Sequence, residues 1–229
     1  MKNAVTNDNS GIMNGPASYL RRPYISYIVP FALYFICTYI PPLLTISPRL
    51  SYPIKTVVVA ASLIYFWNAY RKEIRFSLSW LSVISGVFVF IIWVAPEGLY
   101  PQIGHSEFNP YEYESGYGVY LLIAFRLIDA SFIVPLMEEL FWRSFALRFM
   151  IKPDFRSVPL GQFSWFSFII ISVLFGLEHH RWLVGILAGM VYAGVLYRRR
   201  NLFDPILSHA ITNFLLGLYV LSTHQWSFW

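Results

Sequence analysis

Charged residues are scarce in this sequence of 229 residues, and cysteine is almost absent. Asp, Glu, Lys and Arg make up 13% of the chain, whereas 57% is hydrophobic and 19% aromatic. A soluble domain is about 25% charged and about 45–50% apolar, so this composition excludes an ordinary cytosolic globular protein. The single cysteine, Cys37, excludes an intrachain disulfide framework and a cysteine-rich metal site.

The positive charge is not arranged as in a nucleic-acid-binding protein. The formal net charge is +5, but the Lys and Arg residues fall in short clusters between apolar runs and do not line one amphipathic face. Such clusters are typical of the cytoplasmic ends of membrane spans. We therefore expect the chain to contact a lipid bilayer and no nucleic acid.

Long stretches without charge predict membrane-spanning helices. The first, residues 24–46, has 23 residues, enough to cross about 30 Å of hydrocarbon, although Pro30, Pro41 and Pro42 interrupt it. Further spans are expected at about residues 54–70, 76–96, 118 into the 140s, 162–177, 182–197 and 204–223. The sequence thus predicts an all-α fold, a multi-pass membrane helix bundle of about seven transmembrane helices.

Basic clusters and polar segments predict the orientation and the division of the chain. Arg21 and Arg22 precede the first span, so residues 1–20 are expected to be a disordered cytoplasmic tail and not a cleaved signal peptide. Residues 21–117 form the N-terminal transmembrane helices, with an acidic outer loop from about residue 97. Residues 118–223 form a second helical unit, and residues 224–229 a short tail.

Ionisable residues within the spans are concentrated in the last four. A charged side chain at the bilayer centre costs about 2.5–3.5 kcal/mol even on the lower scales, so a large set implies a shared polar cavity. Arg126 and Asp129, three residues apart, are expected to neutralise each other, and Lys55 to snorkel at the end of the second span. The set comprises Arg126, Asp129, Glu138, Glu139, Arg143, Glu178, His179, His180, Arg181 and His209.

Two carboxylates and an arginine stand together in the fourth span. Glu139 and Arg143 are four residues apart with the acid first, which favours an ion pair. That pairing leaves Glu138 without a partner and available as a general base. Pro135 lies just before and is expected to loosen the backbone hydrogen bonding, as in the irregular helices that line membrane cavities.

Histidines in the fifth and last spans are the other candidates for chemistry. His209 and Asn213 share one face of the last span, although two ordinary hydrogen bonds between helices explain such a pair equally well. His179 shares a helical face with Phe175, so we favour it over His180, which we place at the cavity rim. Straight helices would hold His179 and His209 at different depths, and we therefore expect the fifth and sixth helices to meet inside the bundle. Close helix packing is the expected role of Gly185, Gly189 and Gly194.

Three motifs on successive spans resemble those of the CPBP family (CAAX protease and bacteriocin-processing, or Abi, intramembrane proteases), which includes the type II CAAX prenyl endopeptidases. The motifs are Glu138-Glu139-x-x-x-Arg143, Phe175-x-x-x-His179 and His209-x-x-x-Asn213. The resemblance covers about residues 118–223. The sequence between the motifs, such as the segment Val158-Pro159-Leu160-Gly161, further resembles the bacterial "CAAX prenyl protease-related" subgroup that accompanies exosortase protein-sorting systems.

The resemblance implies an intramembrane endopeptidase in residues 118–223, in a bacterial inner (plasma) membrane, acting on a membrane-associated or lipidated peptide substrate. Glu138 and His179 would activate the attacking water, and His209 and Asn213 would stabilise the oxyanion. Glu139 and Arg143 would support the site electrostatically. A general base and oxyanion donors are also what peptide hydrolysis requires chemically.

The same residues also suggest a zinc site and two other classes of function. Two histidines and one glutamate also make a zinc hydrolase ligand set, but no HExxH motif is present and asparagine is a poor zinc ligand. We therefore favour a mechanism without a metal, with zinc as the alternative. A membrane carrier would usually show related halves, whereas here charge is confined to one half. A non-catalytic binding or immunity protein on the same fold is a third alternative.

Overall fold

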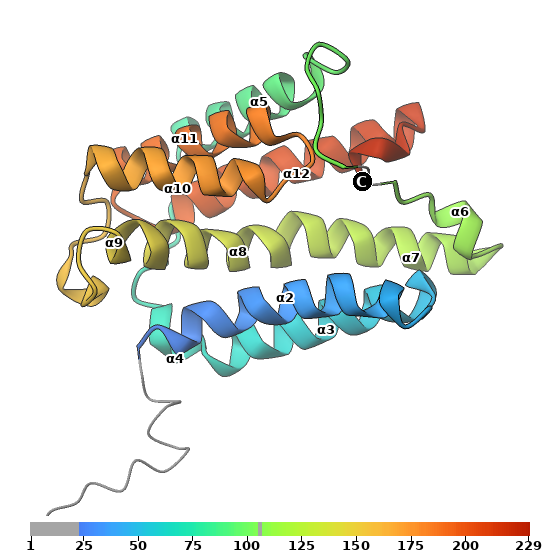
Figure 1. Cartoon of the computed structure of the whole chain (residues 1–229), viewed down its shortest axis with the longest axis horizontal. Coiled ribbons are helices and arrows are strands. Elements are labelled where there is room, and N and C mark those ends of the chain that lie inside the picture. Colours follow the sequence, from blue (N-terminus) through green and yellow to red (C-terminus); the bar gives the residue numbers. More distant parts are fainter. Residues whose placement is uncertain (1–22, 105–106) are drawn as a thin grey trace, which may run out of the picture.

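The described residues of the chain fold into helices that run along one common axis (Figure 1). The computed structural model describes residues 23–104 and 107–229, so the predicted tail of residues 1–20 lies outside the described residues. No strand occurs within these two ranges. Of the helices in these ranges, three are long and apolar enough to cross a membrane: Ile25–Leu43, Tyr117–Phe149 and Phe203–Thr223. The predicted all-α, multi-pass membrane bundle is confirmed.

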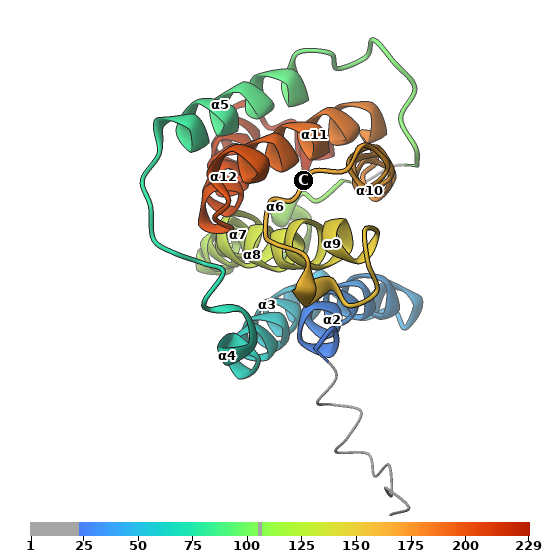
Figure 2. The same cartoon turned by 90° about the vertical axis from the view of Figure 1, so that its left-hand side faces the viewer.

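The helices form two groups on either side of one long helix. The long helix contains α7 (Tyr117–Ile128), η1 (Asp129–Ile133), α8 (Val134–Glu139), η2 (Leu140–Ala146) and α9 (Leu147–Phe149). On one side α2 (Ile25–Leu43) packs against α3 (Pro48–Tyr65), which short α4 (Trp67–Tyr70) follows. On the other side lie α5 (Trp80–Val94), α10 (Trp165–Leu177), α11 (Trp182–Arg199) and α12 (Phe203–Thr223), as the axial view of Figure 2 shows. The remaining short elements are α6 (Pro110–Tyr113), η3 (Phe155–Ser157) and η4 (Trp226–Phe228).

The seven predicted spans correspond to α2, α3, α5, the long helix, α10, α11 and α12, with different ends. The second begins earlier than expected, at Pro48, because the Ser47 hydroxyl caps the helix by accepting from the backbone N–H of Arg49. α12 begins at Phe203, one residue before the expected start of the span, so Asp204 lies inside its first turn. Asp204 is buried there and accepts from Arg199 and Ser82.

A proline shapes the centre of the long helix. Pro135 has no backbone N–H, and the turn just before it, η1, is π-helical. In that turn the backbone N–H of Val134 donates to the carbonyl of Asp129, five residues earlier. The expectation that Pro135 loosens the local hydrogen bonding is therefore confirmed.

Two predictions about charged residues near this turn are wrong. Asp129, the first residue of η1, pairs with Lys55 of α3, with 3.1 Å between Oδ2 and Nζ, and both side chains are buried. Lys55 therefore does not snorkel. Arg126 does not pair with Asp129 but donates to the Tyr52 hydroxyl at 2.5 Å. The backbone from Arg126 to Asp129 is α-helical, as the three-residue spacing presumes, but Asp129 takes its partner from α3.

Candidate active site

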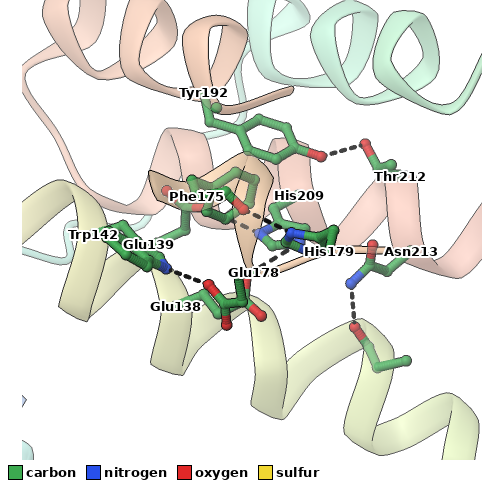
Figure 3. A network of polar contacts seen from close by, with 12 residues as sticks. Glu138, Glu139, Trp142, Phe175, Glu178, His179, Tyr192, His209, Thr212 and Asn213 are labelled. Atoms are coloured by element: carbon green, nitrogen blue, oxygen red, sulfur yellow. Dashed lines mark hydrogen bonds and ion pairs between the residues drawn. The ribbon is translucent and has the colours of Figure 1, made fainter. Parts of the chain in front are cut away.

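A cavity of about 380 Å³ opens between the two groups of helices and the long helix. Its lining includes Glu138, His179, His209 and Asn213, which come from α8, the turn after α10, and α12. Figure 3 shows these side chains converging from the three segments. The structure thus brings together the four residues that the sequence singled out, while their catalytic roles stay a prediction.

Glu138 has an oxygen without a hydrogen-bond partner. The side chain projects into the cavity from the last turn of α8 and is 5% exposed. Within the described residues, its buried Oε2 atom has no hydrogen bond, and Nε2 of His209 lies 4.0 Å from it. A buried acceptor is normally paired, so this oxygen is available to a water or a substrate group.

Glu139 links the arginine of its own helix to the histidine of α12. Its Oε2 atom lies 3.1 Å from Nε of Arg143, which confirms the predicted ion pair. Its Oε1 atom lies 3.0 Å from Nδ1 of His209. An ionised carboxylate only accepts, so Nδ1 of His209 carries a proton and Nε2 is the atom directed toward Glu138. Glu139 is fully buried and positions His209 without lining the cavity itself.

Aromatic rings fix the orientation of these charged groups. The Arg143 guanidinium lies 4.1 Å from the ring centre of Phe175. Tyr192 of α11 stacks on the His209 ring with 4.8 Å between centres and an interplanar angle of 19°. The Tyr192 hydroxyl donates to Thr212 at 2.9 Å, so that ring is itself held at its polar end. The imidazole of His209 is thus fixed both in its plane and by stacking on one of its faces.

His179 caps the end of α10 and presents one ring nitrogen to the cavity. Its Nδ1 atom lies 2.8 Å from the carbonyl oxygen of Phe175, one of the last carbonyls of the helix. A carbonyl only accepts, so Nδ1 carries the proton and a neutral ring keeps a free lone pair on Nε2. The Trp93 ring packs against the His179 ring in a T-shaped arrangement, with 5.4 Å between ring centres. His180 is exposed and bonds to the carbonyl of Ile103, in agreement with the predicted place at the rim.

The expectation that α10 and α11 meet near the site is also confirmed. His179 and His209 line the same cavity, and both rings contact Phe175, at 4.9 and 6.1 Å between ring centres. The end of the turn between the two helices is covered by protein, because Arg181 is buried and pairs with Glu97 at 2.8 Å. The short α10 therefore places His179 at the depth of His209.

Asn213 has a structural hydrogen bond as well as a place in the cavity. Its side-chain amide donates to the carbonyl of Ala130 at 2.8 Å. In the π-helical turn that carbonyl would accept from residue 135, which is a proline without an N–H. Asn213 supplies the missing donor, and the second N–H of its amide is not used by this bond.

Glu178, Trp142 and Tyr192 belong to the site but received no role from the sequence. Trp142 donates from Nε1 to the Glu178 carboxylate at 2.9 Å, and Glu178 lines the cavity. The four-residue spacing of Glu138 and Trp142 was the available signal for Trp142. Nothing in the sequence distinguished Tyr192 from an ordinary apolar-core aromatic.

Glycines allow α10 and α11 to approach closely. A Cβ atom on Gly176 would lie 2.6 Å from the backbone nitrogen of Ile186, and one on Gly185 would lie 2.9 Å from Cα of Gly176. A Cβ atom on Gly189 would lie 3.2 Å from the Phe175 ring and from backbone atoms of Ser172. The predicted packing role is confirmed for Gly185 and Gly189 and wrong for Gly194, around which a Cβ would meet nothing within 4 Å.

The donor set does not form a metal centre as it stands. In the part of the chain that the structure describes, no group of three or more His, Cys, Asp or Glu side chains is arranged to hold a metal ion. We therefore derive no chemical step through a metal.

Comparison with known proteins gives a family match for part of the chain. Residues 120–215 match the family model described as type II CAAX prenyl endopeptidase, Rce1-like. Comparison with the curated proteins and with the solved structures gives no match. The matched segment contains all three motifs, and with them Glu138, His179, His209 and Asn213. In this segment the chain is similar to the Rce1-like family of type II CAAX prenyl endopeptidases.

Proposed function

We propose that the protein is an intramembrane endopeptidase that hydrolyses a peptide bond of a membrane-associated or lipidated substrate. The observation that carries the proposal is the unpartnered Oε2 atom of Glu138, which shares one cavity with His179, His209 and Asn213. A general base needs a free acceptor atom within reach of water, and this carboxylate has one. We further propose that the membrane is a bacterial inner membrane, with the N-terminus in the cytoplasm.

The attacking water is bound between Glu138 and His179. Glu138 takes a proton from the water as the water oxygen bonds to the substrate carbonyl carbon. The free Nε2 of His179 accepts a hydrogen bond from the second O–H of the water. This bond orients the lone pair of the water oxygen. Glu138 then gives its proton to the amide nitrogen as the C–N bond breaks, so protons balance over the cycle.

The oxyanion is stabilised by His209 and Asn213. With its Nδ1 proton directed to Glu139, a neutral His209 would offer only a lone pair at Nε2. Donation to the oxyanion therefore requires the imidazolium form, which the Glu139 carboxylate stabilises while Arg143 balances the charge. Asn213 contributes the side-chain N–H that is not used in its hydrogen bond to the Ala130 carbonyl. Each such donor is worth about 10²–10³ in rate.

The decisive experiment measures peptidase activity of the purified protein in detergent on a mixed library of lipidated and unmodified peptides. Wild type is compared with Glu138→Gln, with Glu112→Gln as the matched control on an exposed carboxylate of α6, and with wild type treated with a chelator. We expect Glu138→Gln to lose at least about 10²-fold in rate while it remains folded, and the other two samples to retain activity.

Other outcomes separate the alternatives. Loss of activity in chelator, restored by zinc, would overturn the metal-free mechanism. No cleavage by folded wild type, together with binding of a library peptide, would favour a non-catalytic binding protein. The library members that are cleaved would distinguish a CAAX-type terminus from a protein-sorting signal.

A further inference from the structure

Glu178 is a carboxylate of the cavity that the proposed mechanism does not use. It is half-buried and follows the last residue of α10 as its C-cap. Its carboxylate lies beside that of Glu138 (Figure 3), where the two charges interact. The Trp142 indole donates to Glu178 at 2.9 Å. That indole is itself held by T-shaped contacts with Phe31 and Phe175, at 5.6 and 6.2 Å between ring centres, so the carboxylate has a fixed position.

Glu178 lacks a cationic partner. No lysine or arginine of the described residues forms an ion pair with it. Arg143 is already held by Glu139 at 3.1 Å. Arg181, three residues after Glu178, is held by Glu97 at 2.8 Å. The only hydrogen bond described for the Glu178 carboxylate comes from a neutral indole, which leaves its charge unbalanced.

The remaining charged side chains of the cavity do not supply the partner. Lys55 is paired with Asp129 at 3.1 Å. Arg126 precedes Glu138 by twelve residues on the long helix. At about 1.5 Å of rise per residue this is about 18 Å, too far for an ion pair at the site.

The charges of the site therefore sum to one negative charge in the reacting state. Three acids and two bases carry charge when the oxyanion is bound: Glu138, Glu139, Glu178, Arg143 and His209. The buried Oε2 atom of Glu138, which is 5% exposed on the side-chain scale, has no hydrogen-bond partner within the described residues. The end of α10 adds to the excess, because the C-terminal end of a helix carries a partial negative charge. Such an excess is costly in an apolar bundle until a cation completes it.

The chemistry of the two carboxylates favours an organic cation. In the part of the chain that the structure describes, no set of three or more ligand side chains is arranged for a metal ion. An ammonium or guanidinium group needs only acceptor oxygens, which Glu178 provides. A lysine or arginine side chain of a peptide in a membrane likewise needs an anionic partner. The cation that fits this position is therefore a basic side chain of the bound peptide.

The helix gives the place of that side chain along the peptide. Glu138 and Trp142 are four residues apart on the long helix, so their Cβ atoms are about 5–6 Å apart. Glu178 bonds to Trp142 and therefore lies about one helical turn from the catalytic carboxylate. An extended peptide advances about 3.3–3.6 Å per residue, so this distance corresponds to one or two residues.

We propose that Glu178 is a specificity-determining residue that binds a lysine or arginine side chain of the substrate within two residues of the scissile bond. The bound cation neutralises Glu178 and leaves Glu138 as the ionised base. This inference rests on the proposed function and narrows it to substrates with a basic residue next to the cleaved bond.

The test compares lysine with norleucine, which lacks only the ammonium group. A lipidated dodecapeptide with a fluorophore on its N-terminus and no other ionisable side chain carries one or the other at a single position, which is moved along the peptide. Mass spectrometry identifies the cleaved bond, and kcat/KM is measured in detergent for wild type, Glu178→Gln and Glu112→Gln. Glutamine keeps an acceptor for Trp142. Glu112 is the matched control, because it is an exposed carboxylate of α6 outside the cavity.

We expect lysine within two residues of the cleaved bond to raise kcat/KM about 10- to 100-fold over norleucine, as for a charged hydrogen-bonded pair. Glu178→Gln should remove this preference and leave kcat/KM of the norleucine peptide unchanged, whereas Glu112→Gln should keep the preference. A structural role of Glu178 would lower both peptides by the same factor, and that result would overturn the proposal. So would a wild type without preference, or a preference that survives Glu178→Gln.

A binding measurement separates this proposal from the function on which it rests. Affinities of both peptides for Glu138→Gln, with and without Glu178→Gln, are measured by fluorescence anisotropy. Tighter binding of the lysine peptide that depends on Glu178, without cleavage by wild type, would sustain the cation site and overturn the peptidase. Cleavage of both peptides at equal kcat/KM would sustain the peptidase and overturn the cation site. Activity that is lost in chelator and restored by zinc, without a lysine preference, would show that the carboxylates hold a metal and that the proposal is wrong.

Discussion

Nδ1 of His209 lies 3.0 Å from Oε1 of Glu139, and this contact joins the last helix of the bundle to the long helix at its centre. The second oxygen of the same carboxylate holds Arg143 at 3.1 Å. One buried acid therefore fixes the ring of His209 and neutralises a buried arginine. The contact orients Nε2 of His209 toward Glu138, 4.0 Å away.

Replacing Glu139 should damage catalysis through His209. Glu139→Gln preserves the size of the side chain and an acceptor oxygen but removes the charge that stabilises an imidazolium. We expect kcat to fall by about 10²-fold with little change in KM, as for loss of one oxyanion donor. The variant should also lose about 3–5 kcal/mol of stability, because Arg143 is left as an unpaired buried charge. Steady-state kinetics and unfolding in detergent measure the two effects.

A second substitution separates the two roles of Glu139. Glu139→Gln combined with Arg143→Met removes the orphaned charge, so stability should recover while kcat stays low. Wild-type kcat in the folded single variant would show that Glu139 only holds the bundle together.

The close approach of α10 and α11 should be needed for the position of His179. A Cβ on Gly176 would lie 2.6 Å from two backbone atoms of α11, so Gly176→Ala must push the helices apart. Phe175 and the His179 ring bonded to its carbonyl would move with α10. We expect a loss of about 1–3 kcal/mol in stability and a fall in kcat/KM.

Gly194→Ala is the matched control on the same pair of helices. No atom lies within 4 Å of the added methyl, and alanine is the better helix former by about 0.5–1 kcal/mol. We expect unchanged activity and equal or higher thermal stability. If both alanine variants behave alike in thermal unfolding and peptidase assays, close packing at Gly176 does not set the position of His179.

Hydrophobic runs predicted the helices because each span must satisfy its backbone internally and face lipid or other helices. The Glu139–Arg143 pair was predictable, since both residues lie on one helix at a fixed spacing. The partner of Asp129 was not, because that partner lies on another helix, α3. Contacts between helices, such as Lys55 with Asp129, depend on the lateral arrangement of the bundle, about which one sequence carries no direct signal.

The candidate site, too, was predictable from the sequence only in part. The motifs identified the residues that converge on the cavity, because their chemical types and spacings are rare in apolar spans. The stacking of Tyr192 on His209 and the bond from Trp142 to Glu178 were not predicted. Aromatic residues are abundant throughout this chain, so their pattern does not distinguish a ring at the site from one in the core.

Lys55 and Asp129 should behave as a buried pair. Their side chains are 4% and 1% exposed, so Lys55→Met leaves an uncompensated carboxylate in the bundle. We expect a loss of about 3–5 kcal/mol for Lys55→Met or Asp129→Leu alone, and near wild-type stability for the double variant. Unfolding of all four proteins in detergent completes the cycle. Additive losses in the double variant would show that the two residues are stabilised by other partners.

Asn213 should have two separable roles, because its amide bonds to the Ala130 carbonyl and also faces the cavity. Asn213→Ala leaves that carbonyl without a donor, which should cost about 1–3 kcal/mol of stability. It also removes a proposed oxyanion donor, so kcat should fall by about 10²–10³-fold.

Pro135→Ala tests the division of these roles within the same helix. It restores a backbone N–H at residue 135, which can bond to the Ala130 carbonyl in the π-helical turn in place of Asn213. In the Asn213→Ala background it should therefore recover stability but not kcat. Recovery of both would mean that Asn213 acts only by supporting the turn, and the oxyanion would then depend on His209 alone. Recovery of neither would show that the missing N–H of Pro135 is not what Asn213 replaces.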